Sequence, residues 1–181
     1  MGVAGLKRAC SIRVEVKATN PARAFVVLVL LLTGCATPVR PSPSDLEATL
    51  PTDIAGLSLD LIQVVDEHFL VGHPIDDPLD RLGKARRDAT VVFRESSEGF
   101  GGLGAATVGG VAGPALLEAV VQTWAAPTVT GRAREVVGNR QVWILREVDG
   151  ATTYVYAVGQ VVYFAFSSDP AHAKAFAEAL P

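Results

Sequence analysis

The sequence predicts an α+β fold, a two-layer sandwich in which helices cover one face of a mainly antiparallel sheet. Three short connections that contain glycine, at 138–139, 149–150 and 159–160, separate β-type segments after Pro127. Such connections are typical of tight hairpins, which make neighbouring strands antiparallel. Helical stripes of apolar residues before and after this C-terminal β-meander each need a sheet face to pack against. The expected element order is β-α-β-β-α-β-β-β-β-α.

The first half of the domain mixes strands and helices. Residues 57–65 begin with alternating apolar residues and end with β-branched ones, which predicts the first strand. Asp77 is expected to cap a short helix that begins at Pro78 and is weakened by Gly83. Apolar periodicity then predicts two strands, the second made of small residues, and a firmer helix, at 90–94, 103–111 and 113–125.

The second half is the β-meander followed by one helix. Asp149-Gly150 is expected to form a type I′ turn, which needs positive φ at both positions. Asp169 and Pro170 are expected to start the last helix. Its apolar stripe consists of Ala173, Phe176, Ala177 and Leu180. The aromatic residues of the meander are expected to pack in the core across strands rather than to form a ligand platform. They are Trp143, Tyr154, Tyr156, Tyr163, Phe164 and Phe166.

A second pattern concerns the N-terminus, where Arg23 is followed by a compact apolar run that ends in Leu-Thr-Gly-Cys at 32–35. As a helix, the run over 24–32 would be ~14 Å long, which is too short to span the ~30 Å core of a bilayer. A charged start, an apolar centre and small residues before the cut are typical of a signal peptide. The motif resembles the lipobox of bacterial lipoproteins. That resemblance implies that Cys35 carries diacylglycerol and that the peptide before it is removed.

The chain is therefore expected to have three parts. Residues 1–34 are the signal peptide, 35–45 the lipidated cysteine with a Pro-rich, extended tether, and 46–181 one α+β domain. The 22 residues before Arg23 make a long charged start, which translation from Val14 or Val16 would shorten.

Charge and cysteine content restrict the function of the mature chain. The whole sequence has 16 basic and 19 acidic residues, and loss of five basic and one acidic residue with the leader leaves a net charge of −7. This negative charge argues against nucleic acid as a partner and against binding of anionic lipid through a polybasic segment. Cys10 leaves with the leader and Cys35 carries lipid, so no disulfide is expected.

The end of the chain contains Val-Gly-Asn-Arg-Gln-Val-Trp, Tyr-Val-Tyr-Ala-Val-Gly-Gln-Val-Val-Tyr and Asp-Pro-Ala-His-Ala-Lys-Ala-Phe-Ala-Glu-Ala-Leu-Pro. These runs resemble the ending of secreted or lipid-anchored proteins from high-GC bacteria. Leu-Pro at 50–51 and at 180–181 brackets the domain as it brackets those proteins. The resemblance covers residues 50–181 and supports the fold, and it brings no catalytic motif and no cofactor.

The densest group of potential metal ligands is the acidic segment 66–77, with His68, His73 and Asp76 as candidate ligands. Imidazole and carboxylate together suit zinc. However, the histidines do not follow an i, i+4 helical spacing, and a polar loop between a strand and a helix explains the segment as well. A solvated loop is therefore the preferred interpretation.

Other candidate motifs are weaker. The glycine-rich segment 98–105 lacks the Gly-Lys-Ser/Thr of a P-loop and fits the dinucleotide fingerprint poorly, so we expect a mobile hairpin loop there. No Gly-x-Ser-x-Gly occurs, and His172 is alone on its predicted helix, where it is expected to be exposed or at an edge.

Two function classes stay open. The favoured one is a non-enzymatic lipoprotein, held in the cell membrane or outer membrane by lipid on Cys35, with its domain outside the cytoplasm. Such a domain binds an envelope protein or a small ligand and needs no cofactor. The alternative is a metal-dependent activity at the acidic loop that contains His68 and His73.

Overall fold

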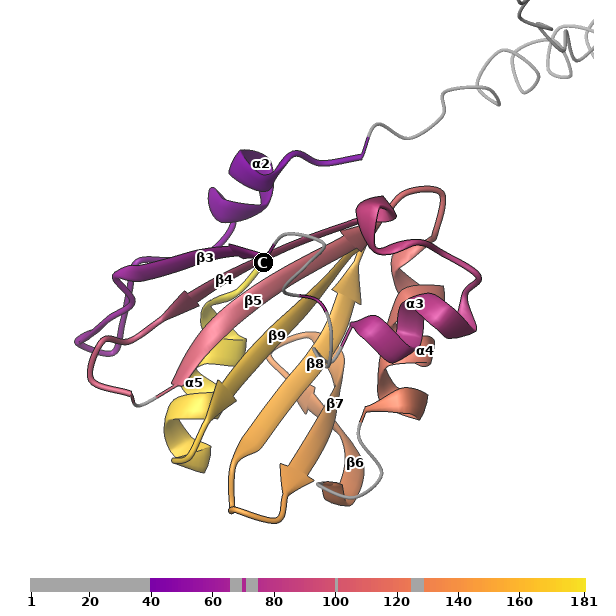
Figure 1. The fold of residues 1–181 in the computed structure, drawn as a ribbon. Helices are drawn as coiled ribbons and strands as arrows, with labels where there is room; N and C mark the ends of the chain where they lie inside the picture. The colour runs from indigo at the N-terminus through magenta and orange to yellow at the C-terminus, as the bar shows by residue number, and fades with distance from the viewer. Residues whose placement is uncertain (1–39, 66–69, 71–74, 100, 125–128) are drawn as a thin grey trace, which may run out of the picture. The chain divides into compact units, whose positions relative to one another are not determined.

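A seven-stranded antiparallel sheet is the centre of the structure (Figure 1). The computed structural model describes residues 40–65, 70, 75–99, 101–124 and 129–181. In spatial order the strands are β3 (Leu61–Val65), β4 (Ala89–Glu95), β5 (Gly101–Val108), β9 (Val161–Ser167), β8 (Thr152–Val158), β7 (Arg140–Glu147) and β6 (Val129–Val137). The α+β class, the antiparallel sheet and the C-terminal meander are confirmed.

Helices and a small hairpin surround this sheet. The described helices are α2 (Pro43–Glu47), α3 (Asp76–Arg81), α4 (Gly113–Thr123) and α5 (Pro170–Ala179), with a 3₁₀ turn at Arg86–Asp88. The strand predicted over 57–65 is divided, because β2 (Leu57–Ser58) pairs with β1 (Asp53–Ile54) and only β3 joins the large sheet. Between them, Leu59 is fully buried and donates its backbone N–H to the carbonyl of Thr52 at 2.8 Å.

Helix α3 begins two residues earlier than the sequence predicted. Asp76 is its first residue, and Ile75 rather than Asp77 occupies the N-cap position, where it makes no side-chain capping hydrogen bond. The helix ends at Arg81, and Gly83 follows with a φ of 63°, a conformation that glycine adopts readily beyond a helix end.

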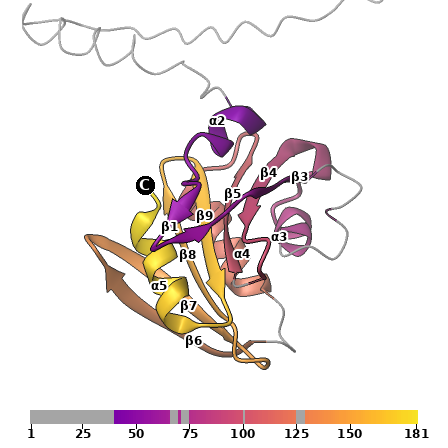
Figure 2. The ribbon, with the colours of Figure 1, turned by 90° about the vertical axis from the view of Figure 1, so that its left-hand side faces the viewer.

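Helices cover both faces of the sheet, whereas the sequence predicted them on one. Along β8, Tyr154 and Tyr156 pack in a core with α5, while Val155 between them packs in a second core with α4. Figure 2 shows α5 and α4 on opposite sides of the sheet. The difference arises because central strands such as 161–166 are apolar at successive positions, which is typical of strands that are buried on both faces.

Two of the three predicted tight turns are confirmed, and the third prediction is wrong. Gly138 and Gly159 have φ values of 62° and 59° at the first position of two-residue turns, as type II′ turns require. At Asp149-Gly150 only the glycine has a positive φ, 92°, and four residues separate β7 from β8. The Asp149 carboxylate accepts a hydrogen bond from the N–H of Ala151 at 3.0 Å, so its side chain directs a longer turn.

The packed structure begins earlier than the predicted domain boundary at residue 46. Helix α2 starts at Pro43, inside the segment that the sequence predicted to be extended. Proline suits the first turn of a helix, and Ser42 and Asp45 form a capping box around it. Local capping therefore overrides the extended tendency of the neighbouring prolines.

Two arginine contacts fix this N-terminal segment to β4. Arg40 donates from Nε to the hydroxyl of Thr90 at 2.7 Å. On the other side of α2, the carboxylate of Glu47 pairs with the nearly buried guanidinium of Arg94 at 3.0 Å. Because both arginine contacts join residues more than forty positions apart, they attach α2 to the sheet rather than to its own neighbours.

Helix α5 is fixed at both ends and along its apolar stripe. Asp169 accepts a hydrogen bond from the N–H two residues on at 2.7 Å, as predicted for an N-cap. At the other end, the Arg140 guanidinium donates to the carbonyl of Ala177 at 3.1 Å and also to those of Leu180 and Pro181. The predicted stripe is buried, which is confirmed for Ala173, Phe176, Ala177 and Leu180.

Phe176→Ala is expected to lower the free energy of unfolding by about 3–5 kcal/mol, because the ring is fully buried. His172→Ala, one turn earlier, is expected to cost less than about 1 kcal/mol. Its side chain is 36% exposed and stacks at the rim, with its ring 6.4 Å from that of Phe176. Chemical denaturation of both variants measures the difference, and equal losses would show that α5 is rotated from the packing described.

Candidate functional site

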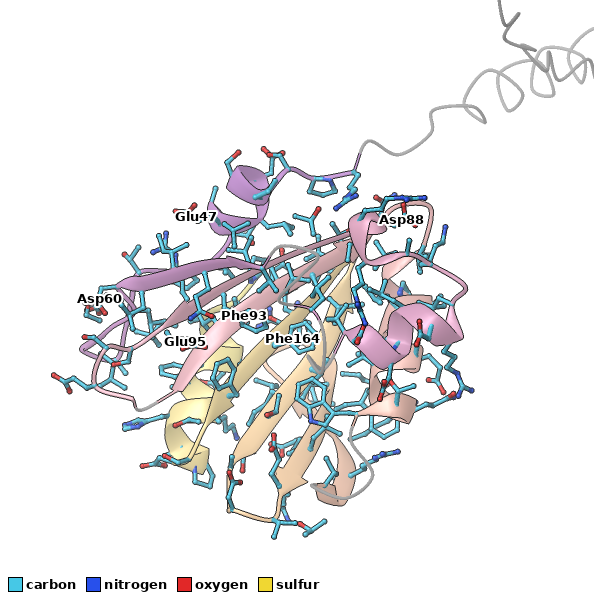
Figure 3. The ribbon with its side chains drawn as sticks, in the orientation of Figure 1. Glu47, Asp60, Asp88, Phe93, Glu95 and Phe164 are labelled. Carbon is cyan, nitrogen blue, oxygen red and sulfur yellow. The ribbon has the colours of Figure 1, made fainter. Side chains whose placement is uncertain are left out.

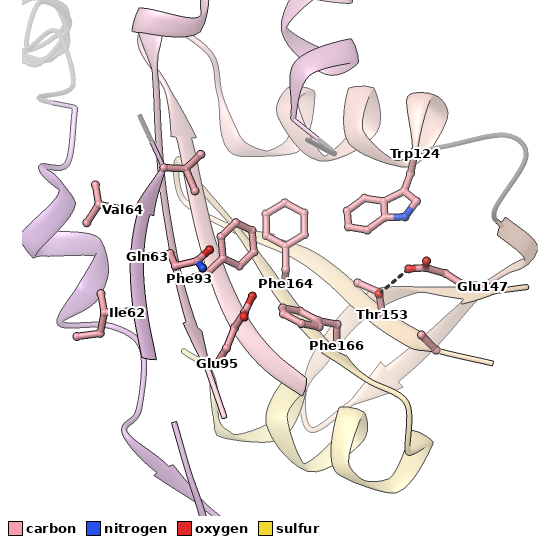
Figure 4. Close-up of a pocket in the computed structure, with 12 residues that line it drawn as sticks. Ile62, Gln63, Val64, Phe93, Glu95, Trp124, Glu147, Thr153, Phe164 and Phe166 are labelled. Atoms are coloured by element: carbon pink, nitrogen blue, oxygen red, sulfur yellow. Dashed lines mark hydrogen bonds between the residues drawn. The ribbon is translucent and has the colours of Figure 1, made fainter. Parts of the chain in front are cut away.

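A pocket of about 800 Å³ lies on the face of the sheet that α4 covers, called the α4 face below (Figure 4). This volume is within the ~300–1,000 Å³ range of sites that hold small organic molecules. The pocket is bounded by β3, β4, β9, the residues around the β7–β8 turn and the end of α4. Its main side chains are those of Phe93, Glu95, Trp124, Glu147, Phe164 and Phe166.

Two glycines of β5 make room for these side chains. A Cβ atom at Gly104 would overlap the ring of Phe93, and one at Gly102 would lie 2.9 Å from the ring of Phe166 and 3.0 Å from Cγ of Glu95. The strand register explains both contacts, because Gly104 pairs with Phe93 on β4 and Gly102 pairs with Phe166 on β9. Large side chains from the two neighbouring strands therefore lean over a β5 backbone that has none of its own at these positions.

Four aromatic rings form a continuous wall. Trp124, directly after α4, and Phe164 have ring centroids 5.7 Å apart, and Phe93 lies 6.2 Å from both Phe164 and Phe166. The rings are tilted or edge-on to one another, as aromatic pairs prefer. Figure 3 shows Phe93 and Phe164 close together on the sheet. Both are buried, whereas Trp124 and Phe166 are half-buried and offer ring surface to a ligand.

Two carboxylates, Glu95 and Glu147, complete the pocket. Both strands that carry them end in an apolar residue followed by Arg-Glu, at 93–95 and at 145–147. The antiparallel order makes β4 and β7 run in the same direction, so their last residues lie at the same end of the sheet. Strand alternation then puts both glutamates on the α4 face. In Figure 4, Phe166 lies between them, and Gln63 on β3 points toward Phe93.

The surroundings of Glu147 disfavour its charged form. Burial raises the pKa of its carboxyl group, and the negative charge of Asp149 raises it further. Hydrogen bonds from the side chains of Thr153 and Trp124 oppose this shift, and the Thr153 hydroxyl donates to Oε1 at 3.4 Å. Neutral hydrogen-bond donors therefore stabilise the ionised carboxylate, and no positive charge is among the causes of its pKa shift.

His68, His73 and Asp76, the candidate metal ligands of the alternative interpretation, cannot be compared with one another, because both histidines lie outside the described residues. The Asp76 carboxylate is described, and it accepts two hydrogen bonds from the guanidinium of Arg86, at 2.6 and 2.8 Å. Within the ranges that the structure covers, no group of three or more histidine, cysteine, aspartate or glutamate side chains is placed to hold a metal ion. Cys35 also lies outside the described residues.

The prediction of a mobile hairpin loop over 98–105 is wrong from Gly101 onward, whereas the overlapping prediction of a strand at 103–111 is confirmed for 103–108. From that residue the chain is β5, which lies inside the sheet between β4 and β9. The signal that sequence reasoning missed is the spacing of Gly102 and Gly104. Glycines two apart in a strand remove side chains from one face only, because successive side chains point to opposite faces.

The expectation that the meander aromatics are core residues is confirmed in part. The residues that pack in the α5 core as predicted are Tyr154, Tyr156 and Tyr163. Trp143 is half-buried, and the guanidinium of Arg134 lies 4.2 Å from its ring centroid. Phe164 is buried in the second core, as predicted, and also lines the pocket, whereas Phe166 is half-buried and lines the pocket.

No protein-family model, curated protein or solved structure matches the chain. In the described parts, no helix combines the length and the apolar character needed to cross a bilayer. The geometry and chemistry of the pocket are therefore the basis on which a function can be argued.

Gly104→Ala is expected to lower the free energy of unfolding by about 1–3 kcal/mol, because its new Cβ must displace the ring of Phe93. Gly109→Ala, in the turn after β5, is the matched control. The nearest atom to a Cβ there is 3.7 Å away, so a change within about 0.5 kcal/mol is expected. Thermal unfolding compares the two variants, and equal Tm values would contradict the close approach described at Gly104.

Glu147→Gln is expected to raise the Tm near pH 7, because it removes a charge that burial and Asp149 disfavour. The raised pKa means that the folded chain binds this proton more tightly than the unfolded chain does. The penalty is therefore full above the raised pKa, and it is lost as the pH falls below the ordinary value of 4.5. Tm measured against pH should show the gain shrinking on acidification, while Glu178→Gln on the exposed side of α5 serves as the control. A gain that does not depend on pH would count against this account.

Proposed function

We propose that the chain is a membrane-anchored lipoprotein of the cell envelope whose domain binds an apolar small molecule and performs no catalysis. The observation that carries this proposal is the pocket of about 800 Å³ walled by four aromatic rings. Small-molecule sites are usually concave and mostly apolar, with a few polar groups that orient the ligand. Covering the accessible rings of Trp124 and Phe166 would supply the binding free energy through burial of apolar surface.

The lipobox-like motif at 32–35 supports the anchor, with diacylglycerol on Cys35 holding the protein in the cell membrane or outer membrane. Arg40, five residues later, already donates a hydrogen bond to the sheet. Five residues of extended chain reach at most ~18 Å, so the anchor would keep the domain close to the bilayer, outside the cytoplasm. A ligand that partitions into the membrane would be concentrated near such a domain.

Binding can be tested on the chain that starts at Ala36, because residues 39–181 form a compact unit of their own. The sequence has two tryptophans, so Trp143→Phe leaves Trp124 as the single reporter inside the pocket. Titration with N-phenyl-1-naphthylamine, a neutral apolar fluorophore, is expected to give a saturable signal at one molecule per chain. Energy transfer from Trp124 should appear with the same saturation.

Phe166→Ala is expected to weaken this binding, because the ring contributes half-exposed apolar surface to the pocket. Val136→Ala on β6 is the control, since that side chain is 62% exposed and lies outside the pocket. If the folded chain, checked by cooperative thermal unfolding, shows no saturable binding, the proposed binding function is wrong.

For the anchor, Cys35→Ala is expected to block lipidation and to leave an uncleaved or mislocalised precursor, because the thioether to diacylglycerol needs this thiol. Cys10→Ala is the matched control, since that cysteine is expected to leave with the leader. Labelling with radioactive palmitate measures both variants. Label entering Cys35→Ala as strongly as the wild-type chain would contradict the anchor.

A further inference from the structure

We infer that the ligand of this pocket is an amphipathic organic cation, with an apolar body and a protonated amine or quaternary ammonium group. The inference rests on the proposed binding function and names its ligand class. Its basis is the juxtaposition of two carboxylates with accessible aromatic rings, in a pocket whose described lining contains no lysine, arginine or histidine.

The two pocket carboxylates differ in their partners from two other partly buried carboxylates of the domain, Glu47 and Asp76. Glu47 pairs with Arg94, and Asp76 pairs with Arg86. Among the described residues, neither Glu95 nor Glu147 forms an ion pair. A half-buried carboxylate without a counter-ion opposes folding, and a cationic ligand would supply the missing charge.

The aromatic wall adds a second attraction for a cation. The face of an aromatic ring is negative, and tryptophan is the strongest of the three aromatic side chains in binding cations. The Trp124 side chain hydrogen-bonds to Glu147, so a cationic group at this end of the pocket can meet both a ring and a carboxylate. Among its described residues the domain already contains two contacts between a cation and a ring. The guanidinium carbon of Arg134 lies 4.2 Å from the ring centroid of Trp143, and that of Arg140 lies 4.8 Å from the ring centroid of Tyr156.

At the other side of the pocket, Glu95 offers an equivalent position. Its Cγ lies over Gly102, next to the ring of Phe166. A ligand whose apolar body covers Phe166 can therefore direct its charged group to either glutamate, because Phe166 lies between them (Figure 4).

The charges around the pocket oppose an anionic ligand. Asp149, in the turn after β7, adds negative potential at Glu147. Arg132 on the neighbouring strand β6 is a positive charge at the edge of the pocket, but it is exposed, its Nη2 donates to the backbone carbonyl of Trp124 at 3.1 Å, and it forms no ion pair with either glutamate. A carboxylate or phosphate ligand would therefore place like charge beside two glutamates, whereas a cation would place opposite charge there.

Three probes with one aromatic body test the inference by calorimetry at pH 7 on the chain that starts at Ala36. They are 1-naphthylmethylammonium, 1-naphthalenemethanol and 1-naphthaleneacetate. The ammonium is expected to bind at least about tenfold more tightly than the alcohol, from charge-assisted hydrogen bonds and ring contact together. The acetate is expected to bind most weakly.

Glutamine variants assign the preference to the two carboxylates. Glu95→Gln and Glu147→Gln are each expected to reduce the preference for ammonium over alcohol by about threefold, and the double variant should bring it close to one. Their affinity for the alcohol should stay within about twofold of the unmodified chain, because the apolar wall is unchanged. Glu178→Gln on α5, outside the pocket, is the control and should keep the full preference. Melting temperatures check that every variant is folded.

The outcomes separate the two proposals. Equal affinity for ammonium and alcohol would overturn the inference and leave the proposed binding function standing. A preference that survives in the double variant would also overturn it, because the preference would then come from the overall negative charge of the chain. If none of the three probes binds to the folded chain, the proposed binding function fails and the inference fails with it.

Discussion

The absence of side chains at Gly102 and Gly104, on the α4 face of β5, is the constraint on which the pocket and the packing around it depend. The backbone carbonyl of Arg94 and the ring of Phe93 stand where Cβ atoms at Gly102 and Gly104 would be, so β4 and β5 can approach only because both positions are glycine. As in any strand, successive side chains of β4 point to opposite faces of the sheet. On the α4 face they line the pocket, and on the α5 face the guanidinium of Arg94 reaches Glu47 and holds α2. The two glycines therefore shape the pocket, and the alternation of β4 supplies from its other face the arginine that holds α2.

The two faces of the sheet are filled to different extents, and the difference leaves room for a ligand. On the α5 face, Phe176 is fully buried and the rings of Tyr156 and Tyr163 stack with centroids 5.7 Å apart. On the α4 face, α4 packs on β8 and β9 and against α3, and the accessible rings of Trp124 and Phe166 lie beyond it. Burial of apolar surface contributes about 25 cal/mol per Å², and these exposed rings do not make that contribution in the free chain. A molecule that covers them would therefore bind the folded chain and stabilise it through mass action.

The features that sequence could predict are those with local causes. Helix α5 has its cap at Asp169 and an apolar stripe within twelve residues, and the turns at Gly138 and Gly159 need only a residue that tolerates positive φ. Which side chains meet on one face of the sheet has no local cause, because it depends on strands that come together from distant parts of the chain. β5 lies between β4 and β9, which start more than seventy residues apart. No motif could therefore show that Phe166 faces Gly102, and the pocket is assembled by register alone.

The charge of the pocket follows from the same alternation. An Arg-Glu pair at a strand end cannot neutralise itself, because successive side chains point to opposite faces of the sheet. At the end of β4, Arg94 therefore forms its ion pair with Glu47 on the α5 face, and Glu95 lies on the α4 face. The same pair ends β7, which runs parallel to β4 with three strands between them, so Glu147 lies at the same end of the same face. Apolar walls around two such carboxylates concentrate negative potential in the cleft. Strand alternation at two separated sites thus places two carboxylates beside the aromatic rings of the pocket, the combination on which the proposed amphipathic cation depends.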